Sequence, residues 1–281
     1  MKLVSDISGL REWRNSVSGS VGFVPTMGAL HNGHLSLVES SNRTCKHTVV
    51  SIYVNPTQFS PNEDLSKYPR NLQADVKKLQ HFNVDVLFFP DDKMMYPDGF
   101  STSVSESQLS SKLEGASRPT HFAGVTTVVT KLFNLVEPTH AFFGKKDAQQ
   151  FRIIRKIVDD LNFDISIIPC EIVRESHGLA HSSRNDYLSI DERKRAGIIH
   201  QALKEAEDIL KKGERSSRVI RETIRQRIST DALSKIDYVS VADTHSLEEI
   251  SGRIEKSILV SVAVYFSNVR LIDNFEFIIR E

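Results

Sequence analysis

The chain has 281 residues, of which 40% are hydrophobic and 26% charged, a composition typical of folded globular proteins and not of disordered ones. Its 36 basic residues balance its 36 acidic residues, so no global charge would attract it to a nucleic-acid backbone or an anionic membrane. The length favours two domains, with enough residues for cores of ordinary size.

Cysteine usage and hydropathy argue against an extracellular or membrane protein. Cys45 and Cys170 lie far apart and have no C-x-x-C or His-rich neighbour, which argues against a zinc site and a disulfide scaffold. The N-terminal segment mixes charged with apolar residues, unlike a signal peptide. The longest apolar run, residues 258–266, is about half a membrane span and contains Ser261. We therefore expect a cytoplasmic protein whose two thiols are buried and reduced.

From residue 21 to about residue 173, short apolar runs alternate with longer amphipathic segments. The apolar runs, which we expect to be strands, are residues 21–24, 48–54, 85–89, 141–143 and 165–168. The amphipathic segments, which we expect to be helices, are residues 35–43, 72–82, 125–136 and 148–161. Strands that are apolar on both faces and alternate with helices indicate a covered parallel sheet. The pattern predicts an α/β domain with a Rossmann-like, doubly wound parallel sheet, in which ligands bind beyond the carboxyl ends of the strands.

After about residue 175 the pattern changes. Two charged amphipathic segments, residues 191–212 and 216–228, are expected to be helices, and strands are expected to follow at residues 236–241, 258–266 and 269–272. Strands that follow helices without alternation indicate a second, smaller α+β domain. We therefore predict a larger domain over residues 1–175 and a smaller one over residues 176–281. Two polar stretches, residues 55–71 and 90–119, exceed usual loop lengths and are candidate covers for a site.

The first strand-to-helix junction reads P-T-M-G-A-L-H-N-G-H and ends at His34. Gly28 and Gly33 permit positive φ or close backbone approach, and the following helix offers unpaired N–H groups. His31 and His34 would lie on one side of the first helical turn and could both face an anion there. Histidines and glycines with a purely structural role at a turn are the alternative. The chain contains neither G-x-G-x-x-G nor G-x-x-x-x-G-K-[ST], so dinucleotide and P-loop interpretations lose their main support.

The second junction, V-N-P-T-Q-F, also follows a strand. The amides of Asn55 and Gln58 suit a substrate that presents hydroxyl groups and a carboxylate. A polar turn built around Pro56 is the alternative.

The third junction reads F-G-K-K-D-A-Q-Q and opens the most clearly amphipathic helix of the chain. Lys146 can neutralise the charge of a transferring phosphate, and Asp147 can accept a hydrogen bond from a ribose hydroxyl or a metal-bound water. Gln150 lies one turn further on. A solvated helix start is the alternative.

The fourth candidate is the polar segment from His181 to Arg184, near the predicted domain boundary. Two serine hydroxyls followed by a guanidinium make a compact clamp for an anion. An ordinary linker is the alternative. No G-x-S-x-G surrounds these serines, so a hydrolase nucleophile is not supported.

Together these motifs resemble one family. The H-x-G-H string resembles the H-I-G-H signature of adenylate-forming nucleotidyltransferases and class I tRNA synthetases. The order of P-T-M-G-A-L-H-N-G-H, V-N-P-T-Q-F, Y-P-R, E-G-A-S-R-P-T-H-F-A-G-V, F-G-K-K-D-A-Q-Q and S-S-R-N is similar to that of the pantothenate synthetase family. A-V-Y-F-S-N-V-R-L-I-D-N near the C-terminus continues the resemblance, which therefore covers nearly the whole chain.

The resemblance implies an ATP-dependent ligase that condenses (R)-pantoate with β-alanine to give pantothenate, AMP and pyrophosphate, with Mg²⁺ accompanying ATP. Pantoate carboxylate would attack the α-phosphorus to form pantoyl adenylate, and the amine of β-alanine would then displace AMP. Such chemistry needs no side-chain nucleophile once the substrates are oriented. The resemblance also implies a homodimer whose smaller domain acts as a lid. From the balanced charge we expect no nucleic-acid or membrane partner.

The resemblance also assigns roles to individual residues. The ATP site would comprise Met27, Gly28, Ala29, Leu30, His31, Asn32, Gly33, His34, Gly144, Lys145, Lys146, Asp147, Val173, His181, Ser182, Ser183 and Arg184. Catalysis would rest on three of these: His34 as proton donor to pyrophosphate, His31 beside it on the phosphates, and Lys146 as the transition-state cation. Gln58 and Gln150 would hold pantoate, and Gln58 would also neighbour β-alanine. Residues 68–70 would belong to a covering loop.

Two positions depart from the family pattern. His181 stands where methionine or lysine is more usual, and the charge of an imidazole there would vary near neutral pH. Thr120 replaces a usual glycine, which puts the local backbone geometry in question.

Two other functions remain to be weighed against this one. A different nucleotidyltransferase on the same scaffold would bind ATP without needing pantoate. A nucleotide-sensing or RNA-associated protein would use the arginines of residues 215–227, although acidic neighbours make a solvated helix the simpler explanation.

Overall fold

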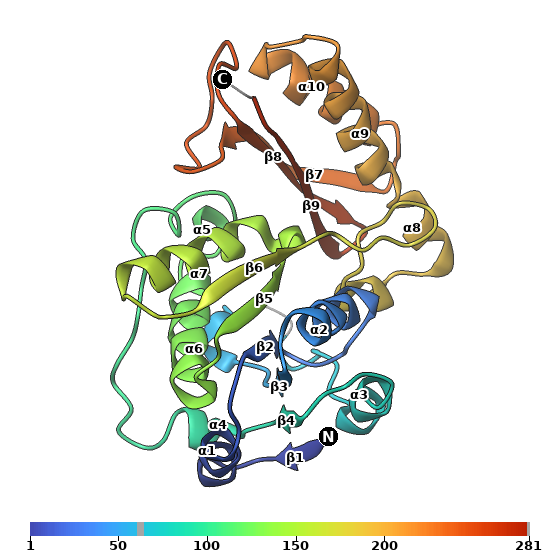
Figure 1. The fold of residues 1–281 in the computed structure, drawn as a ribbon. Coiled ribbons are helices and arrows are strands. Elements are labelled where there is room, and N and C mark those ends of the chain that lie inside the picture. Colours follow the sequence, from blue (N-terminus) through green and yellow to red (C-terminus); the bar gives the residue numbers. More distant parts are fainter. Residues whose placement is uncertain (61–64, 280–281) are drawn as a thin grey trace. The chain divides into compact units, whose positions relative to one another are not determined.

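The computed structural model describes residues 1–60 and 65–279 of the chain (Figure 1). Two compact units divide the chain: Met1–Lys145 with Gln149–Glu171, and Lys146–Ala148 with Ile172–Glu281. The second unit thus begins at Ile172, where the sequence predicted a start at residue 176, and it takes a short segment from the first half of the chain. In the part of the chain that the structure describes, no helix is both long and apolar enough to cross a bilayer.

The larger unit contains a parallel sheet, as the sequence predicted, and this sheet has six strands. Its strands are β1 (Lys2–Val4), β2 (Val21–Thr26), β3 (His47–Ile52), β4 (Val86–Phe88), β5 (His140–Gly144) and β6 (Ser166–Cys170). The spatial order is β1-β4-β3-β2-β5-β6, so the chain winds outward from β2 in both directions. The reversal lies between β2 and β5, where doubly wound sheets open a crevice for ligands. β1 was not predicted, because it has only three residues and buries one of them, Val4.

Helices cover both faces of this sheet (Figure 1). They are α1 (Ile7–Ser16), α2 (Asn32–Thr44), α3 (Leu72–Leu79), α6 (His121–Val136) and α7 (Ala148–Asp160), with short turns α4 (Asp92–Met95) and α5 (Glu114–Ser117). Leucines and valines of α2 and α3 pack with Val24, Val50 and Leu87 of the sheet. On the other face, the ring of Phe133 in α6 packs edge to face against the ring of Phe23, with the ring centroids 6.3 Å apart. These apolar layers cover both faces of the sheet, and the polar junctions lie at the carboxyl ends of its strands.

Both cysteines are free and buried, as the sequence predicted. Burial raises the pKa of the Cys45 thiol and of the Cys170 thiol. Both sulfurs therefore stay protonated and unreactive at neutral pH.

The smaller unit is an antiparallel sheet of three strands with helices against it. Its strands are β7 (Ser234–Asp243), β8 (Ile258–Phe266) and β9 (Val269–Phe277), and its helices are α8 (Ile190–Arg195), α9 (Ile198–Lys211) and α10 (Ser217–Ile228). The core between them is made of valines and isoleucines of the sheet and the apolar stripes of α9 and α10. The predicted α+β fold of this part is therefore confirmed.

The prediction of one continuous helix over residues 191–212 is wrong. The chain breaks at Ala196 and Gly197, which separate α8 from α9. A Cβ on Gly197 would lie 2.4 Å from the carbonyl oxygen of His177, so only glycine fits this close approach. Because the approaching carbonyl comes from a distant segment, the helical periodicity of the sequence could not show it.

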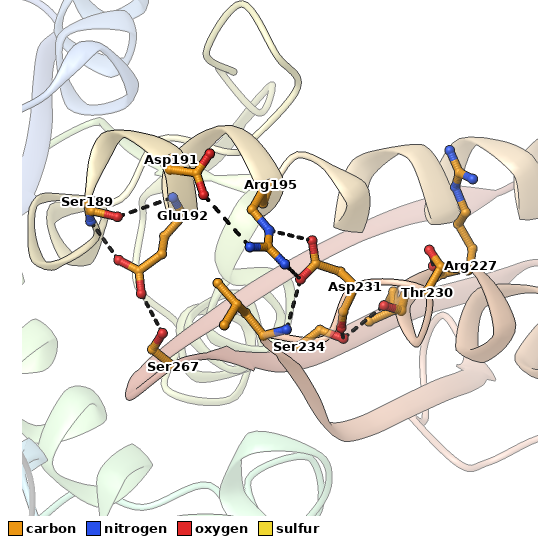
Figure 2. Close-up of polar contacts among 11 residues, drawn as sticks. Ser189, Asp191, Glu192, Arg195, Arg227, Thr230, Asp231, Ser234 and Ser267 are labelled. Carbon is orange, nitrogen blue, oxygen red and sulfur yellow. Dashed lines mark hydrogen bonds and ion pairs between the residues drawn. The ribbon is translucent and has the colours of Figure 1, made fainter.

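Polar contacts fasten α8 to the turns beside it (Figure 2). Ser189 and Glu192 form a capping box, in which the Ser189 N–H donates to Glu192 Oε2 at 2.8 Å. The hydroxyl of Ser267 also donates to the Glu192 carboxylate. Arg195 donates from Nε and Nη2 to the two oxygens of Asp231, at 2.9 and 2.8 Å. α8 is thus held at its start and at its end.

Glu192 should make the stability of the protein depend on acid pH. Donation by Ser267 and Ser189 lowers the pKa of the Glu192 carboxyl from its usual 4.5 to about 2. The ionised carboxylate therefore stabilises the fold fully above about pH 4.5, and this contribution is lost as the pH falls towards 2. We expect Glu192→Gln to lower the melting temperature at pH 7 and to lower it less at pH 3.5. Glu255→Gln, at an exposed position, is the control. If Glu192→Gln lowered the melting temperature equally at both pH values, the prediction would be contradicted.

Candidate active site

Three of the predicted site segments begin where neighbouring strands of the larger unit end. β2 ends at Thr26, directly before residues 27–34, and is paired with both β3 and β5. The turn η1 (Pro56–Gln58) follows β3, and Gly144 ends β5. The carboxyl ends of parallel strands share one edge of the sheet, so these segments meet there. Gln58 shows the convergence directly, because its Nε2 donates to Met27 Sδ at 2.8 Å.

The loop after β2 has an unusual backbone. Gly28 has φ 84° and Ala29 has φ 49°, so two successive residues are left-handed. A Cβ on Gly28 would also lie 3.0 Å from Ile52 Cγ2, which is a second reason for glycine. The expectation for Gly28 is therefore confirmed. Gly33 is different, since it lies in the first turn of α2 without a positive φ.

Asp75 of α3, which is not among the predicted site residues, holds this loop. Its carboxylate is 2% exposed and accepts from the backbone N–H of Ala29 at 2.9 Å and of Leu30 at 2.8 Å. Lys78 Nζ, one turn further along α3, donates to the carbonyl of Leu30 at 2.5 Å. A signal was present in the sequence, because Asp75 is an acid on the apolar stripe that includes Leu72 and Leu79. Such a position marks a carboxylate with buried partners.

Asp75→Asn is expected to lower the free energy of unfolding by about 1–3 kcal/mol. The amide keeps the size of the side chain but offers one acceptor to two backbone donors, so one buried N–H faces an NH₂ group. Urea denaturation of the variant measures the loss. Glu12→Gln on the exposed side of α1 is the matched control. Equal stability of Asp75→Asn and the wild type would show that the carboxylate does not hold the loop.

The two histidines of H-x-G-H form a close, tilted pair at the start of α2. His31 is the N-cap residue, and its Nδ1 accepts from the N–H of Gly33 at 3.1 Å. His34 Nδ1 accepts from the N–H of His31 at 3.4 Å, which completes a reciprocal capping box. The ring centroids are 4.0 Å apart with 32° between the planes. The prediction that both rings lie on one side of the first turn is confirmed.

This capping box determines where each ring carries its proton. Because each Nδ1 accepts a hydrogen bond, the neutral imidazoles of His31 and His34 are protonated at Nε2. The Nε2–H group is therefore the donor of each neutral ring. Both rings lie beside the first turn of a helix of 13 residues, whose dipole favours an anion. A turn with two oriented N–H donors and a helix N-terminus suits phosphate chemistry.

Gln58 is held by the buried side chain of Asn55. Asn55 is 1% exposed, and its Nδ2 donates to Gln58 Oε1 at 3.2 Å and to the carbonyl of Gly124 at 3.1 Å. Tyr96 Oη donates to Asn55 Oδ1 at 2.8 Å, which orients the amide of Asn55. With Oε1 fixed in this way, Nε2 of Gln58 points to Met27.

The E-G-A-S-R-P-T-H-F-A-G-V motif packs against the same turn. His121 Nδ1 lies 2.8 Å from the carbonyl oxygen of Gln58. A Cβ on Gly124 would lie 2.5 Å from the carbonyl oxygen of Thr57, so α6 touches η1 backbone to backbone. Thr120 has φ −95° and ψ −11°, an ordinary right-handed conformation. The backbone at this position therefore does not require glycine. The motif thus supports the turn that carries Gln58.

The two glutamines of α7 have different surroundings. Gln150, the predicted pantoate residue, is half-buried in the first turns of α7. Its neighbour Gln149 is 4% exposed, and its Nε2 donates to the carbonyls of Leu109 and Lys112 at 2.8 and 2.7 Å. Gln149 therefore anchors part of the stretch of residues 90–119. Of the other predicted cover, residues 55–71, positions 61–64 lie outside the described residues.

The remaining predicted residues fall at η2 (Lys145–Asp147) and in the smaller unit. Lys145 pairs with the Glu171 carboxylate, whereas Lys146 Nζ lies 3.8 Å from Asp147 Oδ1. The His181 N–H donates to the carbonyl of Val173 at 2.9 Å, so these two residues face each other across a turn. Ser182 caps η3 (Ser183–Tyr187), because its hydroxyl accepts from the Arg184 N–H. Val173 and residues 181–184 are thus brought together.

Burial resolves the question of charge at His181. Desolvation lowers the pKa of its imidazole below the ordinary value of 6.5. The ring is therefore neutral at neutral pH, where a variable charge was expected. A neutral imidazole offers one N–H donor to a ligand.

Comparison with known proteins identifies the family. A family model described as pantoate-beta-alanine ligase matches residues 2–276. The pantothenate synthetase of Acetivibrio thermocellus is 51% identical over 277 residues, which are 98% of this chain and 97% of that protein.

Two solved structures are similar over almost their whole length. A crystal structure of pantothenate synthetase from Thermus thermophilus has a TM-score of 0.92 at 41% identity, covering 98% of this chain and 99% of that one. A crystal structure of pantoate-beta-alanine ligase from Francisella tularensis, complexed with beta-gamma ATP and beta-alanine, has a TM-score of 0.79 at 36% identity, covering 98% and 97%. The chain therefore belongs to the pantoate-beta-alanine ligase family of enzymes.

Proposed function

We propose that this enzyme condenses (R)-pantoate with β-alanine in an ATP-dependent reaction that passes through pantoyl adenylate and releases AMP and pyrophosphate. Family membership supports the two organic substrates. The Francisella tularensis relative, whose structure contains beta-gamma ATP and beta-alanine, supports ATP as the third. The observation that supports the adenylation step is the close pair of His31 and His34, in which each Nδ1 accepts a capping hydrogen bond and Nε2–H is the donor of each neutral ring.

In the first step a carboxylate oxygen of pantoate attacks the α-phosphorus, and the bond from that phosphorus to the pyrophosphate oxygen breaks. Negative charge builds on the departing pyrophosphate. Nε2–H of His34 would donate to it, with His31 beside it on the phosphates. The loop of residues 27–30, fixed by Asp75, would place its backbone along the nucleotide.

Pantoate would be held by the amides of Gln58 and Gln150. An amide both donates and accepts hydrogen bonds, so it can orient a hydroxyl group and a carboxylate at once. Gln58 suits this task because Asn55 fixes its orientation. Gln58 would also neighbour β-alanine in the second step, in which the amine attacks the carbonyl carbon of the adenylate and AMP leaves.

The ATP phosphates would also be met by Lys146 and by residues 181–184, while Gly144, Lys145, Asp147 and Val173 would hold adenosine. Arg184 brings a permanent charge and the serines bring short donors. Mg²⁺ would enter with ATP and take most of its ligands from phosphate oxygens and water. Asp147 is the carboxylate proposed to reach a metal-bound water. Within residues 1–60 and 65–279, no three His, Cys, Asp or Glu side chains gather to hold a metal.

Omission of single substrates tests this function. Purified protein with ATP, Mg²⁺, pantoate and β-alanine should release AMP, and without β-alanine it should retain pantoyl adenylate. AMP release at the same rate without pantoate would show that the substrate assignment is wrong and would favour another nucleotidyltransferase. The RNA alternative loses support, because Arg221 and Arg227 of α10 pair with Glu249 and Glu205.

The proposal includes a cytoplasmic homodimer, with residues 1–175 binding nucleotide and pantoate and residues 176–281 acting as a lid. These statements rest on the family resemblance. Light scattering coupled to size-exclusion chromatography measures the mass in solution, and a mass of one chain at micromolar concentration would remove the homodimer from the proposal.

A further inference from the structure

The V-R-L-I-D-N string near the C-terminus belongs to the family resemblance but has no role in the proposed reaction. It lies on β9, the edge strand of the three-stranded sheet. Its last two residues, Asp273 and Asn274, are 3% and 6% exposed. Two adjacent buried polar side chains on a strand need partners, and both have one.

Asp273 binds the turn that carries the Ser-Ser-Arg segment. Arg174 donates from Nη1 and Nη2 to the two carboxylate oxygens of Asp273, at 2.6 and 2.9 Å. Arg174 Nη1 also donates to the carbonyl of Gly178, and Arg174 is bridged to Ala180 across the turn. The bidentate pair therefore fixes the turn that leads directly into residues 181–184.

Asn274 binds the other phosphate-directed segment. Its Nδ2 donates to the carbonyl oxygen of Lys146 at 2.8 Å. This hydrogen bond fixes the backbone of Lys146 and does not involve its ammonium group. The N–H of Asn274 donates to Asp273 Oδ1 at 2.8 Å, so the two side chains are also coupled to each other.

The strand geometry sets these two segments on opposite faces of β9. Adjacent side chains of a strand point to opposite faces. Asp273 is paired in register with Val262, a residue of the core beneath α9 and α10, whereas Asn274 is paired with Ser261 on the other face. One edge strand thus holds Lys146 on one side and the turn before Arg184 on the other.

We propose that Asp273 and Asn274 are positioning residues that fix Lys146 and the Ser182–Arg184 segment for the phosphates of ATP. This inference rests on the proposed function, in which both segments meet the phosphates. Asn274 acts through Lys146, and Asp273 acts through Arg174. Neither touches a reacting atom.

The test uses Asn274→Ala and the near-isosteric Asn274→Asp, which keeps the volume and loses the N–H donor. Each should lower kcat for pantoate-dependent AMP release about tenfold, the loss of one hydrogen bond, while KM for pantoate stays unchanged. Backbone amide exchange of residues 145–150 should accelerate in both variants. Glu276→Gln, an exposed change on the same strand, should alter neither quantity.

A double mutant separates positioning through Lys146 from a general structural effect. If Asn274 acts through the Lys146 side chain, Asn274→Ala should lower the rate no further in a Lys146→Ala background. A multiplicative loss in the double mutant would overturn the inference. Unchanged exchange of residues 145–150 in Asn274→Ala would overturn it while leaving the proposed function intact. Full activity of Lys146→Ala would overturn the proposed ATP site itself.

One variant, Asp273→Asn, tests the role of Asp273. Asp273→Asn should raise KM for ATP and accelerate amide exchange of residues 174–184, with the rest of the smaller unit unchanged. Exchange that accelerates uniformly over the smaller unit would show that Asp273 supports the fold and not the turn.

Discussion

Replacing Lys146 by alanine is expected to slow pantoate-dependent AMP release by about 100- to 1,000-fold, the usual loss when one preorganised charge-stabilising donor is removed. The fold should survive, because Asn274 binds the backbone of Lys146 and not its ammonium group. The ammonium lies 3.8 Å from the Asp147 carboxylate, and its side chain is 19% exposed, so it is partly desolvated and stabilises charge more strongly than a fully solvated lysine.

Single-turnover assays and thermal melts of Lys146→Ala would measure both parts of this prediction. Lys156→Ala is the matched control, since Lys156 pairs with Asp160 on an exposed face of α7. The control should keep its turnover. A Lys146→Ala rate within a few-fold of the wild type would remove Lys146 from the reaction.

Replacing His34 by asparagine is expected to reduce adenylation by a similar factor, again about 100- to 1,000-fold. Asparagine has a polar atom near the position of Nδ1 and can still accept from the N–H of His31, so the capping box survives. It has no group at the position of Nε2, so the proposed donor to pyrophosphate is lost. The change therefore separates the capping role of the ring from its chemical role.

Comparison with His34→Ala sharpens the test. Alanine removes the cap as well, and we expect it to lower the free energy of unfolding by about 1 kcal/mol more than asparagine does. His81→Asn at an exposed position is the control. If His34→Asn turned over like the wild type, the Nε2–H group would have no part in the reaction.

The sequence predicted the framework well because the framework depends on local periodicity. The apolar runs and amphipathic stripes identified five of the six parallel strands and four helices that cover them, and the motifs identified the family. α2 begins at Asn32, three residues before the predicted start, because Asn32, Gly33 and His34 carry no apolar stripe. The capping role of His31 appears only once the backbone is in place.

What the sequence did not reveal are contacts between distant segments. Asp75 reaches a loop more than forty residues away, and no local pattern names its partner. The same holds for Asn274 and Lys146. For Asp75 a signal existed in the form of an acid on an apolar stripe. For Asn274 the signal was the V-R-L-I-D-N string, which belongs to the family resemblance but has no role in the proposed reaction.

The contact at Gly124 has a consequence for altering the specificity of this enzyme. Even a methyl group there would collide with the turn that carries Gln58, because the backbones of that helix and that turn are in direct contact. A library designed to accept a longer or bulkier hydroxy acid would gain nothing by varying Gly124. Varying Tyr96 would also disturb the Gln58 amide, because the Tyr96 hydroxyl orients the Asn55 side chain that holds it.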